Sequence, residues 1–80
     1  MKKVIGTKVY NTETSELILT LNNGLRRSQR DYYKTKKGAF FVHYVDINDI
    51  ELVPELSMAE LLMKYDVDKY IELFGAVEEG

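Results

Sequence analysis

The residues best suited to chemistry in this chain are cations and aromatic rings that alternate within one short stretch. Residues 26–37 contain six cations against one anion, and the cations are Arg26, Arg27, Arg30, Lys34, Lys36 and Lys37. Tyr32 and Tyr33 lie among them. Cations neutralise phosphates or acidic protein surfaces, and aromatic rings stack on nucleic-acid bases. We therefore predict a partner-binding surface made of the six cations and Tyr33.

This basic stretch leaves three interpretations open. It could contact an acidic surface of a protein partner, bind nucleic acid directly, or form an exposed hairpin tip whose lysines prevent edge pairing. The net charge of −2 weighs against nucleic acid, because domains that bind it are usually basic. Residues 46–80 hold ten anions and two cations. Their carboxylates could mimic phosphates, although solvated helix faces explain them more simply.

Catalytic groups are sparse in the sequence. The single histidine, His43, lies in an apolar stretch without an identifiable partner for general acid–base chemistry. None of the serines has the Gly-x-Ser-x-Gly context of a nucleophile elbow, and the five glycines stand singly rather than in a phosphate-binding loop. We predict a protein that is not an enzyme and that uses no cofactor.

The composition also argues against metal sites and membrane spans. The chain has no cysteine and one histidine, which disfavours zinc. Residues 46–51 are rich in oxygen ligands, but a calcium loop starting at Asp46 would need a ligand at Ile50 and glycine at Glu51. No apolar run approaches the ~20 residues that span a bilayer. We expect a cytoplasmic protein with no bound metal and no membrane partner.

Eighty residues predict a single domain, with a β-rich part at 1–53, a helical part at 54–75 and an acidic tail at 76–80. The hydrophobic period is two before Pro54 and between three and four after it. Strands are expected at 3–10, 16–22, 30–35, 39–45 and, more briefly, 50–53. The first two should pair through a turn at 11–14, with Leu17, Leu19 and Leu21 on the buried face. The next two should pair through a loop at 36–38 with Gly38 at positive φ.

Two helices should follow Pro54. Ser57 and Glu60 have the spacing of a capping box, Asp66 can cap the second helix, and Gly75 suits its end. The predicted fold is α+β: a four-stranded, mainly antiparallel sheet from two β-hairpins, with two short C-terminal helices packed on one face.

Three stretches, 9–18, 33–41 and 67–75, together show a family pattern. They contain the turn Tyr10-Asn11-Thr12-Glu13-Thr14, the hairpin Tyr33-Lys34-Thr35-Lys36-Lys37-Gly38 and the helix end Phe74-Gly75. In this order they resemble small, mostly uncharacterised proteins carried by phages and mobile elements of Gram-positive bacteria. Those proteins usually have a longer, glycine-rich segment after the second hairpin, whereas 46–55 is short here.

The resemblance implies a setting rather than a site, and no functional residue is carried over from it. Small proteins of such elements often inhibit host defence, including CRISPR nucleases. We therefore expect a non-enzymatic interaction protein in the cytoplasm of a bacterial host, which inhibits a defence nuclease, or its complex, by occlusion. The alternative is an accessory protein that binds nucleic acid through residues 26–37. The sequence also leaves open whether the protein forms a homodimer.

Overall fold

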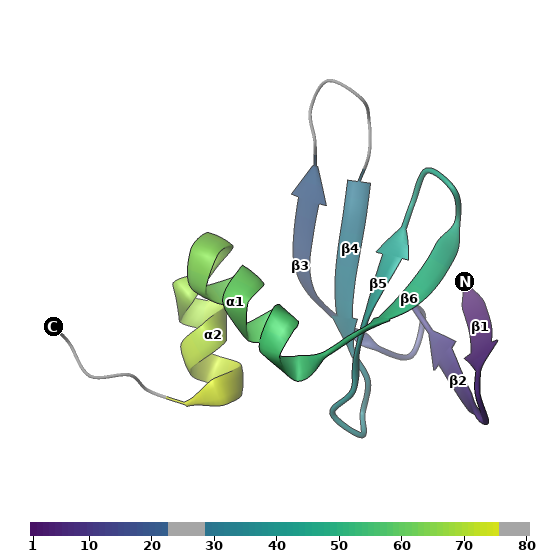
Figure 1. Cartoon of the computed structure of the whole chain (residues 1–80), viewed down its shortest axis with the longest axis horizontal. Helices are drawn as coiled ribbons and strands as arrows, with labels where there is room; N and C mark the ends of the chain where they lie inside the picture. The colour runs from purple at the N-terminus through teal and green to yellow at the C-terminus, as the bar shows by residue number, and fades with distance from the viewer. Residues whose placement is uncertain (23–28, 76–80) are drawn as a thin grey trace, which may run out of the picture.

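A four-stranded antiparallel sheet forms the centre of the computed structural model, which describes residues 1–22 and 29–75 (Figure 1). Its strands are β3 (Glu16–Asn22), β4 (Gln29–Lys34), β5 (Phe40–Tyr44) and β6 (Asp49–Val53), and each pairs with the next. β1 (Lys2–Ile5) and β2 (Lys8–Asn11) form a separate sheet, and α1 (Glu55–Tyr65) and α2 (Val67–Phe74) follow β6. The predicted α+β class and four-stranded antiparallel sheet are confirmed; the tail at 76–80 lies outside the described residues.

The N-terminal strand prediction is wrong. Gly6, at φ +65°, and Thr7 form a turn that folds this segment into its own hairpin, with Val4 opposite Val9. The alternating pattern continues on both sides of Gly6, so one long strand was expected where two short ones form. β3 consequently pairs with β4 rather than with the N-terminal strand. The predicted hairpin of the next two strands, β4 and β5, is confirmed, and β6 pairs with β5.

The sheet has an apolar core on each face because successive side chains of a strand point to opposite sides. Phe40 faces the helices, and it belongs to a cluster with Ile18, Tyr32, Val42, Met58 and Leu62. Phe41 faces the N-terminal hairpin, where it packs with Tyr10 and Ile50. The helices and the hairpin accordingly lie on opposite sides of the sheet (Figure 1). β5 is an inner strand of the sheet. Removing a buried side chain of the helix-side core, such as Leu62, should cost about 2–5 kcal/mol.

The expected apolar face of β3 is only partly correct. The register of β3 against β4 shifts between Leu17 and Leu19, so an extra residue is accommodated there. Ile18 is consequently buried, while Leu17 is 50% exposed. Leu19 and Leu21 pack against the core on the helix side, as predicted.

The helix boundaries confirm two of the three capping predictions. α1 starts at Glu55, and the Met58 amide already donates to the Pro54 carbonyl at 3.0 Å, so Ser57 lies inside the first turn and the capping box is wrong. Asp66 caps α2 by accepting from the Lys69 amide at 3.2 Å. Gly75 ends α2 at φ +98°, and its amide donates to Ile71. In the part of the chain described, neither helix is long and apolar enough to cross a membrane.

Candidate functional site

The predicted partner surface is divided between the two ends of β4. Lys34 ends this strand, and Lys36 and Lys37 follow in the loop to β5. Arg30 lies four residues before Lys34, which corresponds to about 13 Å along an extended strand. Arg26 and Arg27 lie outside the described residues. Of the four cations that lie within the described residues, the structure therefore brings three together.

The β4–β5 loop (residues 35–39) is closed by hydrogen bonds at its base. The Thr35 amide donates to the Ala39 carbonyl at 2.8 Å, and the Ala39 amide donates to the Thr35 hydroxyl at 3.1 Å. The Gly38 amide donates to the Thr35 carbonyl at 3.0 Å, with Gly38 at φ +90° as predicted. This network holds the exposed residues Lys36 and Lys37, which we call the hairpin tip, in one backbone conformation.

The lysines of the hairpin tip have no carboxylate partner among residues 1–22 and 29–75. The ion pairs of that part of the chain are Lys3–Asp49, Lys69–Glu16 and Lys69–Glu72. Lys34 lies directly opposite Glu16 in the β3–β4 register, but the Glu16 carboxylate contacts Lys69 at 3.5 Å. The tip therefore carries two uncompensated positive charges in solvent.

Tyr33 belongs to the core beneath the N-terminal hairpin. Its ring stacks on Phe41 across the β4–β5 pair, with centroids 5.2 Å apart and an interplanar angle of 12°. Burial raises the pKa of the Tyr33 hydroxyl above its usual value, and the nearby Asp31 carboxylate raises it further. One face of the ring is thus already covered by protein.

His43 contacts a turn residue rather than a carboxylate in the described part of the chain. Its Nε2 lies 2.9 Å from Oδ1 of Asn48, the residue at φ +50° in the turn between β5 and β6. Asp31 is its cross-strand neighbour, and that carboxylate accepts from Thr20 and Gln29 at 3.1 and 2.9 Å. Within the described ranges, no group of three His, Asp or Glu residues is placed to hold a metal ion.

The two helices form an acidic layer. The two helices with the Asp66 between them contain Glu55, Glu60, Asp66, Asp68 and Glu72 against Lys64 and Lys69. Lys69 is itself engaged, since its ammonium donates to Glu72 at 2.7 Å and contacts Glu16. The sheet thus separates an acidic helical layer from the N-terminal hairpin, whose cations are Lys2, Lys3 and Lys8 (Figure 1).

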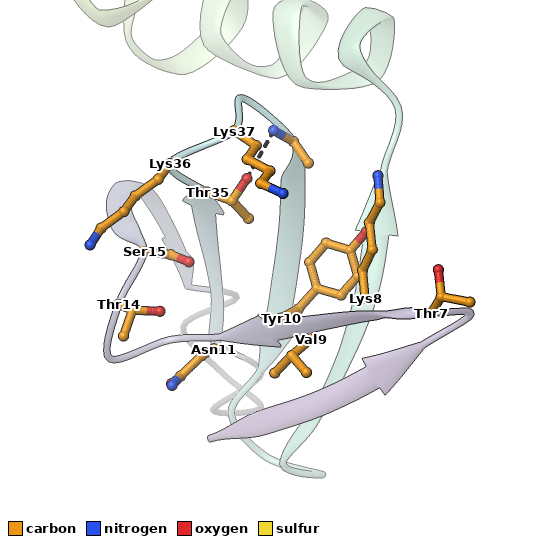
Figure 2. Close-up of a pocket in the computed structure, with 11 residues that line it drawn as sticks. Thr7, Lys8, Val9, Tyr10, Asn11, Thr14, Ser15, Thr35, Lys36 and Lys37 are labelled. Atoms are coloured by element: carbon orange, nitrogen blue, oxygen red, sulfur yellow. Dashed lines mark hydrogen bonds between the residues drawn. The ribbon is translucent and has the colours of Figure 1, made fainter.

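A cleft that the sequence did not predict lies between β2 and the β4–β5 loop (Figure 2). It has a volume of about 590 Å³, and we call it the lysine cleft. Its polar lining comprises Thr7, Lys8, Tyr10, Asn11, Thr14, Ser15, Thr35, Lys36 and Lys37, and no carboxylate lines it.

Finding the lysine cleft from sequence would have required placing Lys8 beside a loop almost thirty residues later. The available signal was Gly6, whose position inside an alternating stretch marks a turn. No family model, no curated protein and no solved structure matches this chain.

Proposed function

We propose that this chain is a small non-enzymatic interaction protein that binds an acidic surface of a protein partner through its hairpin tip. By covering that surface, it would inhibit the partner through occlusion. The observation that carries the proposal is the pair of exposed lysines, Lys36 and Lys37, on a hydrogen-bonded loop without a carboxylate partner in the described chain.

Charge and rigidity both support this role for the tip. Uncompensated surface cations attract an acidic partner over distance and raise the association rate. The closed loop between Thr35 and Ala39 already holds the backbone in place, so binding orders little additional chain. The acidic helices form no ion pair with Lys36 or Lys37 in the described part of the chain.

The proposed biological setting comes from the sequence pattern. Residues 33–41, which include the tip, are part of the resemblance to small proteins of phages and mobile elements. That setting favours the cytoplasm of a bacterial host and a defence nuclease, or its complex, as the partner, with the chain acting as an anti-CRISPR type of inhibitor.

The experiment is capture of tagged protein from a host lysate that has been digested with nuclease. Wild type is compared with Lys36→Glu/Lys37→Glu and with a control, Lys2→Glu/Lys64→Glu, which makes the same charge change at exposed lysines of β1 and α1. We expect wild type and control to retain a single protein that the tip variant loses, with equal melting temperatures. Equal retention by the tip variant would contradict the proposal.

The second candidate function is nucleic-acid binding, which the lysine cleft favours because lysines and hydroxyls line it without a carboxylate. In that case, capture should disappear after nuclease digestion. Binding to an oligonucleotide should also weaken steeply with salt, with a logarithmic slope of about −0.7 for each phosphate of a single strand that is neutralised.

A further inference from the structure

We propose that the lysine cleft is a binding site for a phosphate group. This inference does not depend on the proposed protein partner. The cleft shares Lys36 and Lys37 with the hairpin tip, but β2 contributes Lys8 and Tyr10, which the tip interaction does not use. Variants of Lys8 and Tyr10 therefore test the site separately from the tip.

The charges around the cleft favour the binding of an anion. Lys8, Lys36 and Lys37 line it, and none of them forms an ion pair with a described residue. Figure 2 shows Lys8 rising from β2 toward the loop and Lys37 directed toward β2, whereas Lys36 extends outward on the side of Thr14. Lys8 and Lys37 are therefore the pair placed to contact a bound anion, and Lys36 adds charge at the rim.

Tyr10 supplies a donor that no described residue uses. The residue is only 6% exposed, and its ring packs edge-to-face with that of Phe41, with centroids 5.7 Å apart at 66°. The hydroxyl nevertheless makes no hydrogen bond to any described residue, and no described side-chain polar atom is buried without a partner. Solvent or a ligand in the cleft must therefore satisfy it. Because packing fixes the ring, the hydroxyl is held in position before binding.

Further hydroxyls complete a set of donors for tetrahedral oxygens. Thr14, Ser15 and Thr35 line the cleft on one side, with Thr35 at the base of the loop (Figure 2). The Thr35 oxygen accepts from the Ala39 amide, so its proton stays available to donate. Lysine ammoniums and neutral hydroxyls are groups that commonly bind phosphate oxygens, the former as point charges.

The size of the cleft indicates a phosphate attached to a larger group. A volume of about 590 Å³ exceeds what one phosphate fills and lies within the usual range of small-molecule sites. A phosphorylated small molecule and one nucleotide of a nucleic-acid strand share this chemistry. We assign the phosphate to Lys8, Lys37 and Tyr10.

The test is an NMR titration of the ¹⁵N-labelled protein with sodium phosphate, run against sodium chloride at equal ionic strength. Saturable shifts are expected at the amides of Lys8, Tyr10, Thr35 and Lys37 with phosphate and not with chloride. Lys8→Gln and Lys37→Gln should each weaken binding by about tenfold, the usual scale for one charged hydrogen bond. The matched control Lys64→Gln, on α1, should bind as wild type does.

Tyr10→Phe keeps the buried ring and removes the hydroxyl, so it should weaken phosphate binding at an unchanged melting temperature. Identical shifts with phosphate and chloride, or equal affinities of Lys8→Gln and wild type, would overturn the proposal. Retained partner capture by Lys8→Gln would separate this site from the tip interaction.

Two further titrations identify the source of the phosphate. Tighter binding of a nucleoside monophosphate than of inorganic phosphate, with no further gain for a short single-stranded oligonucleotide, indicates a small phosphorylated ligand. Tighter binding of the oligonucleotide with a steep salt dependence indicates a nucleic-acid backbone.

Discussion

Lys3 of β1 and Asp49 of β6 form an ion pair at 2.6 Å that joins the N-terminal hairpin to the edge strand of the main sheet. The same ammonium donates to the Ile50 carbonyl at 3.1 Å. The hairpin is therefore held by a polar clamp at its side as well as by the packing of Tyr10 on Phe41 and Ile50. Since β2 carries Lys8 and Tyr10, this clamp also positions one wall of the lysine cleft.

Lowering the pH should release this clamp. The hydrogen bond from Lys3 lowers the pKa of Asp49 below its ordinary value of 3.8, and the Ile50 amide lowers it further. A lowered folded-state pKa means that this stabilisation is present above the unfolded value and is lost as pH falls through the folded one. We expect the protection of the β1 and β2 amides, measured relative to their intrinsic exchange rates, to fall below about pH 4, before that of β4 and β5. Hydrogen exchange followed by NMR measures this.

The matched variant is Lys3→Gln, which removes the charge and shortens the side chain by one bond. Its hairpin amides should already exchange faster at neutral pH, and the acid-dependent step should disappear. An unchanged acid step in Lys3→Gln would show that another carboxylate controls the hairpin.

High pH should destabilise the same core through Tyr33. Burial raises the pKa of Tyr33 above 10.0, and burial, followed by Glu51, raises that of Tyr44. In the unfolded chain each hydroxyl ionises near its ordinary value, so their stabilising contributions are complete below about pH 10 and are lost as pH rises through the folded values. Tyr33→Phe should therefore lose less unfolding free energy between neutral and alkaline pH than wild type, and Tyr33→Phe/Tyr44→Phe less still.

Urea unfolding at a series of pH values, read by circular dichroism, measures this dependence. The ultraviolet absorbance of tyrosinate provides a direct check, because the high-pH component of the wild-type titration should be smaller in Tyr33→Phe. If the unfolding free energies of wild type and Tyr33→Phe fell in parallel with rising pH, the predicted role of Tyr33 would be contradicted.

The features predicted correctly from sequence are those that one local segment determines. The loop at 36–38 follows from one glycine between two apolar strands, and the Asp66 cap follows from its place before Val67. The errors concern choices between competing local signals. The alternating pattern predicted one strand through Gly6, but the positive φ of Gly6 allows a turn that ends the strand there. The capping-box pattern placed the start of the first helix at Ser57, but the helix already begins after Pro54. The lysine cleft depends on where the N-terminal hairpin docks, which involves contacts between segments far apart in sequence.

Substitutions of Asp66 and Ser57, the two predicted N-caps, should differ in their effect on stability. Asp66→Ala removes an acceptor that the Lys69 amide uses, so it should lower the unfolding free energy by about 0.5–2 kcal/mol. Ser57 is an exposed residue inside the first turn of α1, where no side-chain cap bond forms. Ser57→Ala should therefore change stability by less than about 0.5 kcal/mol. Urea unfolding measures both changes. A larger loss of unfolding free energy for Ser57→Ala would support the capping box instead.

The conformation of the hairpin tip depends on Gly38. Its φ of +90° is strained for any L-residue with a side chain, although nothing lies within 4 Å of where a Cβ would be. Gly38→Ala should therefore destabilise the fold by about 1–3 kcal/mol through backbone strain alone. A D-alanine at the same position, introduced by chemical synthesis, has the opposite backbone preference and should be neutral. Thermal unfolding distinguishes strain from steric conflict, because conflict would destabilise both chains. The L-alanine variant should also capture less partner, since its tip no longer holds Lys36 and Lys37 in one arrangement.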